Sequence, residues 1–142
     1  MAAVVRVKIC CIRDVEEARL AVEAGASALG LVSEMPSGPG VIDEETIAAV
    51  AASAPPAVAT FLLTCLTDAA HIAAQVRRTH VSTVQICDRP EPGTAAALRR
   101  ALPALKVVQV VHVTGPASVA VWKSVEIWPA GSIRRSRWSL IT

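Results

Sequence analysis

The sequence predicts an α/β fold built on a parallel sheet. Two observations support this prediction. Five short apolar runs alternate with four helical segments between residues 4 and 111. The connections between these segments are short, and several contain Pro or Gly. Such alternation is typical of β-α units, whose parallel strands form either a doubly wound sheet or a barrel.

The first predicted strand is residues 4–9, which are β-branched and apolar apart from Arg6 and Lys8. This composition is that of a buried strand. A helical segment follows it, and residues 28–32 form the next apolar run. The three segments together predict a β-α-β unit, a pattern that the rest of the chain repeats.

The helix of this unit has a start signal and an end signal. Asp14 lies three residues before Glu17, which is the spacing of a capping box. Between residues 18 and 25 the apolar side chains recur at helical spacing and give one apolar face. Gly25 follows at the usual C-cap position, so the helix is expected to end there.

The later segments follow the same order. Asp43 precedes an acidic first turn, and Thr67 or Asp68 is expected to cap the next helix. The further predicted strands are residues 58–63, 81–86 and 106–111, and the further predicted helices are residues 44–53, 69–78 and 94–102.

Composition narrows the class of protein. A chain of 142 residues is one ordinary domain. No uninterrupted apolar run approaches the ~18 residues of a membrane span. The start of the sequence lacks the pattern of a signal peptide. We therefore expect a cytoplasmic protein that does not associate with membranes. A formal charge of +2 gives no reason to expect a nucleic-acid partner.

The end of the sequence differs from the rest. All three tryptophans, Trp122, Trp128 and Trp138, fall in it, and the Ala/Val richness of the body is lost. We therefore expect a partial barrel domain over residues 1–121 and an atypical tail over residues 122–142. Such a tail is either a genuine appendage or the product of a truncated or frame-shifted reading frame, and we favour the second.

Four segments carry a resemblance to a known family. Residues 7–10 read V-K-I-C, and residues 21–32 read A-V-E-A-G-A-S-A-L-G-L-V. Residues 55–58 read P-P-A-V, and residues 84–86 read V-Q-I. Over about residues 4–118 the chain resembles phosphoribosylanthranilate isomerase.

The resemblance implies a parallel (β/α) barrel of the TIM type, here a partial barrel of about five to six β-α units. It implies an Amadori rearrangement of N-(5-phosphoribosyl)anthranilate in tryptophan biosynthesis, acting on a small phosphorylated substrate without a cofactor. That reaction needs a general acid to open the ribose ring and a general base to remove the proton from C2 of the Schiff base. Cys10 matches the family's base.

The departures from the family pattern are equally specific. Cys11 replaces a glycine, Arg13 a threonine, Pro39 a substrate-binding arginine and Cys87 a histidine. The family's general acid and its phosphate-binding glycines follow strands six to eight, and this sequence shows no match to them. We therefore expect the chain alone to be inactive. The alternatives are a divergent, non-catalytic relative that binds a small ligand, or a truncated product without a function of its own.

Further candidate residues lie at the ends of the predicted strands. Gln85, Cys87, His112 and Cys11 are candidates for substrate contacts. A barrel would gather the four cysteines, Cys65 included, on one face. Their spacing contains no metal-binding motif, so no metal site is predicted.

A barrel of five or six strands is open and has two free edges, which promote association. The first strand would lack a neighbour on one side, and apolar side chains facing the barrel interior would lose the opposite wall. We therefore expect self-association through the exposed sheet edges, or a partly molten monomer.

Overall fold

The structure, a computed structural model, describes residues 5–118. Within this range five strands form a single sheet in the order β1-β2-β3-β4-β5. All four neighbouring pairs are parallel. This confirms the predicted parallel sheet, and the sequential order fits a partial barrel rather than a doubly wound sheet, whose order reverses across the first strand. The predicted tail lies outside the described residues.

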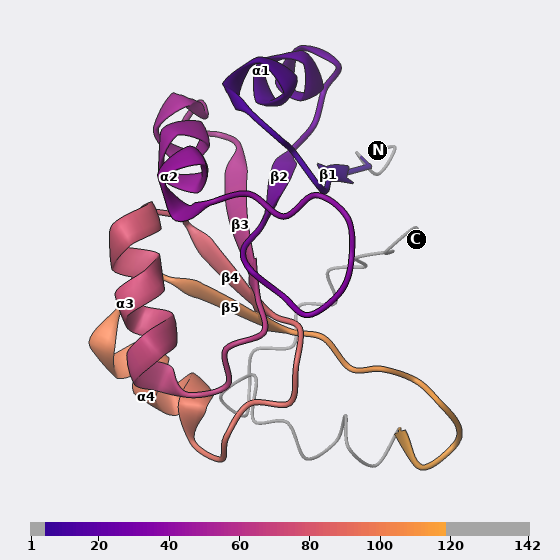
Figure 1. Cartoon of the computed structure of the whole chain (residues 1–142), viewed down its shortest axis with the longest axis vertical. Coiled ribbons are helices and arrows are strands. Elements are labelled where there is room, and N and C mark those ends of the chain that lie inside the picture. The colour runs from indigo at the N-terminus through magenta and orange to yellow at the C-terminus, as the bar shows by residue number, and fades with distance from the viewer. Residues whose placement is uncertain (1–4, 119–142) are drawn as a thin grey trace.

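Strands and helices alternate along the chain, and Figure 1 shows α2, α3 and α4 together along one side of the strands. The elements are β1 (Lys8–Ile9), α1 (Val15–Glu23), β2 (Ala28–Val32), α2 (Glu44–Ser53), β3 (Ala59–Thr64), α3 (Ala69–Thr79), β4 (Thr83–Ile86), α4 (Thr94–Ala101) and β5 (Lys106–Gln109).

The main apolar core lies between the sheet and its helices. Leu31, Leu62 and Val84 are partners in the strand register and are fully buried. Ile47 of α2 and Ile72 of α3 belong to the same buried cluster. Each such side chain stabilises the fold by about 1.5–3 kcal/mol relative to an exposed one. Because side chains alternate along a strand, the other face of the sheet is left for polar and functional groups.

The first strand is shorter and more exposed than predicted. Only Lys8–Ile9 pairs with β2, although residues 4–9 were expected to form a buried strand. Val5 is 81% exposed, Val7 44% and Ile9 40%. The expectation of burial is therefore wrong for these residues. The physical reason is that β1 is an edge of the described sheet, with β2 as its single neighbour there.

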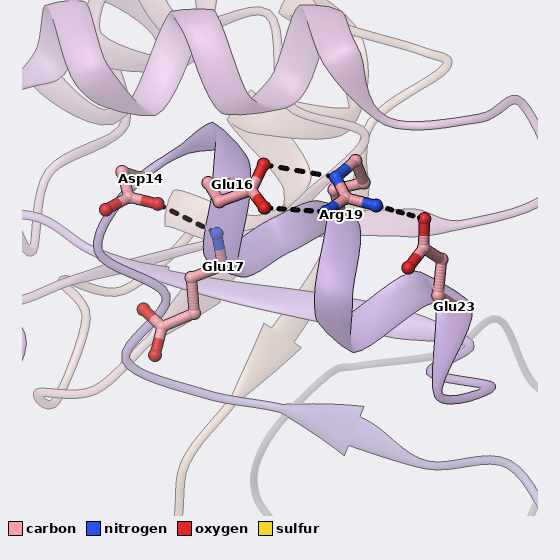
Figure 2. Close-up of polar contacts among 5 residues, drawn as sticks. All are labelled: Asp14, Glu16, Glu17, Arg19 and Glu23. Carbon is pink, nitrogen blue, oxygen red and sulfur yellow. Dashed lines mark hydrogen bonds and ion pairs between the residues drawn. The ribbon is translucent and has the colours of Figure 1, made fainter.

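Helix α1 begins as the sequence predicts, with one difference. Asp14 Oδ1 accepts a hydrogen bond from the Glu17 backbone N–H at 2.8 Å, as Figure 2 shows. The Glu17 carboxylate accepts from the Arg13 backbone N–H at 2.7 Å, one residue before the position that a capping box uses. Gly25, just past the helix, has φ +96°, a conformation that glycine adopts without strain.

Charged side chains on the exposed face of α1 form ion pairs. Figure 2 shows Arg19 between Glu16 and Glu23, with 2.6 Å between Arg19 Nη2 and Glu16 Oε1. Arg19 lowers the pKa of Glu16 by hydrogen bonding and charge. Exposed pairs of this kind contribute little to stability.

Candidate active site

The parallel sheet gathers the predicted site residues at one end. Cys10 directly follows β1, Cys65 follows β3 and Cys87 follows β4, while His112 comes three residues after β5. Since all strands run in the same direction, these residues lie at the carboxyl ends of the strands. That is the edge at which (β/α) barrels place their active sites.

Cys10 lies against β2, next to Gly30. The strand register pairs Ile9 with Leu29, so Cys10 and Gly30 are the next facing residues. A Cβ atom added at Gly30 would be 2.7 Å from Cys10 Sγ and 3.0 Å from Cys10 Cα. The missing side chain of Gly30 therefore makes room for the thiol. Cys10 is also solvent-exposed, so its thiol is open to a reactant.

The side chain of Lys8 extends from β1 to β4 across the face of the sheet that is opposite the helices. Its Nζ donates a hydrogen bond to Gln85 Oε1 at 2.7 Å and lies 4.8 Å from the centroid of the Phe61 ring. Lys8 faces Ala28 in the register, and the small side chain there leaves space for the lysine. A polar contact and a cation–π contact thus link the edge strand to the middle of the sheet.

Gln85, predicted to contact substrate, has its side-chain oxygen bound to Lys8. Its side-chain Nε2 donates a long hydrogen bond, 3.9 Å, to Cys87 Sγ. Sequence reasoning missed Lys8, although a lysine in a mostly apolar strand was a visible signal. Such a cation needs a polar partner when it faces inward.

Cys87 is half-buried beside Gln85, and its thiol is protonated at neutral pH. Burial raises the pKa of Cys87, and the charge of Cys65 raises it further. The Gln85 side chain and the charge of Lys8 act in the opposite direction. Burial also raises the pKa of Cys65, with Asp88 adding to the effect.

His112 comes three residues after β5 and lies beside Cys87. Its Nε2 is 3.1 Å from the Cys87 carbonyl oxygen. Because a carbonyl can only accept, Nε2 carries the hydrogen, and a neutral ring then has its acceptor on Nδ1. The ring is exposed and is held in one orientation by this bond.

Cys11 contacts the loop between β2 and α2. Its Sγ donates a hydrogen bond to the Pro39 carbonyl at 3.6 Å, and a Cβ at Gly40 would lie 2.5 Å from Cys11 Cβ. Cys11 has φ +61°, in the left-handed region that favours the glycine of the resemblance. The structure thus places Cys11 against the loop position where the resemblance has an arginine.

Other features of the described residues lie away from this end. A hollow of about 330 Å³ lies between α1 and the end of α2, on the helix side of β2, with Val22, Leu29 and Pro55 in its wall. Within residues 5–118, no three His, Cys, Asp or Glu side chains are arranged to hold a metal ion. No helix in that range is long and apolar enough to cross a bilayer.

Comparison with known proteins gives a consistent result. No family model matches the chain. It is 32% identical over 122 residues to N-(5'-phosphoribosyl)anthranilate isomerase 2 of Methanosarcina mazei, covering 85% of this chain and 54% of that protein. It is 37% identical over 107 residues to the N-(5'-phosphoribosyl)anthranilate isomerase of Geobacter metallireducens, covering 75% and 52%. The chain spans about half the length of these curated relatives.

The fold agrees with this sequence likeness. A crystal structure of phosphoribosyl anthranilate isomerase in complex with reduced 1-(o-carboxyphenylamino)-1-deoxyribulose 5-phosphate superposes with a TM-score of 0.70. The two chains are 26% identical, and the match covers 84% of this chain and 59% of the other. Sequence identity and the shared parallel sheet together show that the chain is similar, over about half of their length, to phosphoribosylanthranilate isomerases.

Proposed function

We propose that the chain provides the base-bearing part of an isomerase site for N-(5-phosphoribosyl)anthranilate, with Cys10 as the general base. The observation that supports this is the place of Cys10: at the carboxyl end of β1, exposed, and next to the space left by Gly30. Its thiolate would remove the proton from C2 of the Schiff base. A positioned base of this kind contributes a rate factor of about 10²–10⁴.

The neighbouring residues have supporting roles in this proposal. His112, oriented by the Cys87 carbonyl, would contact the substrate through Nδ1. Gln85 and Cys87 would lie between Cys10 and His112 and contact the substrate there. Cys11 would hold the loop between β2 and α2 through its contact with Pro39. The solved relative binds a reduced aminoribulose 5-phosphate, so the substrate class we propose is a small phosphorylated aminosugar. The rearrangement moves hydrogens within one molecule and needs no cofactor.

We expect no measurable turnover from this chain alone. Pro39 offers no charge where the resemblance has a substrate-binding arginine, and Cys87 offers a protonated thiol in place of an imidazole. Residues 5–118 also show no match to the family's general acid or phosphate-binding glycines. An isomerisation assay of the chain and of Cys10→Ala tests this. Turnover above background that disappears in Cys10→Ala would contradict the expectation.

A second candidate function, binding of a small ligand without catalysis, is favoured by the contact between Cys11 and Pro39. This contact holds Pro39, which stands where the resemblance has an arginine, against Cys11. Calorimetric titration with the reduced aminoribulose 5-phosphate distinguishes the two functions. Binding that Cys10→Ala leaves unchanged, and no turnover, would favour the second.

We also propose that the chain self-associates through the β1 edge. Val5, Val7 and Ile9 are exposed there beside a strand with a single described neighbour. An unpaired apolar edge promotes strand pairing between molecules. Val7→Lys should shift light-scattering mass toward the monomer, whereas Leu20→Lys on exposed α1 should not. A monodisperse wild-type monomer that melts cooperatively would contradict this. A cytoplasmic location and the lack of a nucleic-acid partner stay predictions.

A further inference from the structure

Two cysteines face each other across neighbouring strands at the carboxyl end of the sheet. The register of β3 and β4 pairs Leu63 with Gln85 and Thr64 with Ile86. The Cys87 backbone N–H donates to the Thr64 carbonyl at 2.9 Å, which continues the ladder one step past the strands. Cys65 and Cys87 are therefore the next facing pair.

The separation of such a pair suits a disulfide. Neighbouring strands lie about 4.8 Å apart, and the Cα atoms of a disulfide are about 4.4–6.8 Å apart. Since side chains alternate along each strand, both thiols fall on the same face as Leu63 and Gln85. Each is half-buried rather than enclosed, so a small reagent can reach them.

We propose that Cys65 and Cys87 form a thiol–disulfide site that reacts with low-molecular-weight disulfides. This assignment does not depend on isomerase activity. It includes Cys87, which stands where the family pattern has a histidine.

Burial raises the pKa of both thiols, so their surroundings do not single out one of them as the first to react. The thiolate of one cysteine displaces one thiolate from the reagent and then carries a mixed disulfide. The thiolate of the other cysteine attacks the protein sulfur of that mixed disulfide and releases the second thiolate. Two protein thiols are oxidised, and the reagent disulfide is reduced to two thiols.

The experiment treats the full chain with glutathione disulfide under native conditions and measures intact mass. We expect a loss of two hydrogens, about 2 Da, because one disulfide forms. Trypsin places Cys65 in residues 20–77 and Cys87 in residues 79–99, while Cys10 and Cys11 share residues 9–13. The expected product joins the first two of these peptides.

Matched variants complete the test. Cys65→Ser should stop at a mixed disulfide on Cys87, and Cys87→Ser should prevent the bridge. Cys11→Ser, which leaves the pair intact, should form the bridge like the wild type. The rate should rise with pH as the thiols ionise.

A wild-type chain that keeps all its thiols would overturn the proposal. So would a chain that accumulates only mixed disulfides, or one that joins Cys87 to the peptide that holds Cys10 and Cys11. The wild-type peptide map decides between these outcomes even where a variant fails to fold. Because the readout is mass, it is independent of turnover, and either proposal can fail alone.

Discussion

The ammonium of Lys8 and the side-chain oxygen of Gln85 are 2.7 Å apart, although 77 positions separate them in sequence. The bond joins β1, an edge strand of the described sheet, to β4 across two intervening strands. It fixes the orientation of the Gln85 amide, so that Nε2 points toward Cys87. A continuous set of polar contacts therefore connects Lys8 and Gln85, in the sheet, to Cys87 at its carboxyl end.

Replacing Lys8 by Met should destabilise the fold by about 1–2 kcal/mol, because it removes a hydrogen bond and a cation–π contact and leaves Gln85 without its partner. Lys106→Met is the control, since Lys106 lies on an exposed position of β5. Urea denaturation followed by circular dichroism measures both. Equal midpoints for the two variants would show that the Lys8 contacts contribute nothing.

Replacing Cys11 by Gly should stabilise the chain by about 0.5–1 kcal/mol, because glycine adopts a positive φ without strain. The lost contact to Pro39 is long, at 3.6 Å, and offsets only part of this gain. His80→Gly, at φ +55° after α3, should behave in the same way and serves as a comparison. A lower urea midpoint for Cys11→Gly alone would mean that the contact with the loop outweighs the strain.

Replacing Gly30 by Ala should displace the Cys10 thiol, because the new Cβ would fall 2.7 Å from Sγ. The crowding should cost about 1–3 kcal/mol. In a Cys11→Ser background, the rate at which iodoacetamide alkylates Cys10, read from the mass of the peptide 9–13, should change with it. Gly115→Ala is the matched control, since no atom lies within 4 Å of its added Cβ. An unchanged alkylation rate in Gly30→Ala would contradict the role given to Gly30.

Lowering the pH below about 4 should destabilise the chain through its helix caps. The backbone N–H of Thr46 lowers the pKa of Asp43, and that of His71 lowers the pKa of Asp68. A carboxylate whose pKa is lower in the folded state stabilises the fold fully above its unfolded pKa. That contribution is lost as the pH falls through the folded value.

The double variant Asp43→Asn, Asp68→Asn tests this mechanism, because asparagine caps a helix without titrating. Its urea midpoint should fall less than that of the wild type between pH 7 and pH 3. The difference between the two proteins at pH 7 serves as the internal reference. Parallel losses would mean that other groups cause the acid sensitivity.

Local signals predicted most of the fold. The residues of β2 match the predicted run, and Asp14, Asp43 and Asp68 cap the helices that they precede. Caps and apolar spacing depend on neighbours within one turn or one strand, so they can be read from the sequence. The length of β1 could not, because pairing depends on the strands beside it.

The sequence predicted which residues lie at the carboxyl ends of the strands, but not which side chains contact each other there. Parallel strands place Cys10, Cys87 and His112 at one end, and that follows from the alternation of segments alone. The contacts of Lys8 with Gln85, and of Cys11 with Pro39, join residues far apart in sequence. Such contacts depend on how the sheet curves and how the loop folds back, and no local pattern encodes either.

The most direct measurement is the isomerisation rate of a chimera. It joins residues 5–118 of this chain to the remaining part of the Methanosarcina mazei relative, with Pro39→Arg and Cys87→His introduced. We predict turnover that falls by about 10²–10⁴-fold in Cys10→Ala, as expected when a general base is removed. Cys65→Ala, at the end of another strand, should retain it. A folded chimera without turnover, or one that Cys10→Ala leaves unchanged, would contradict the assignment of Cys10 as the base.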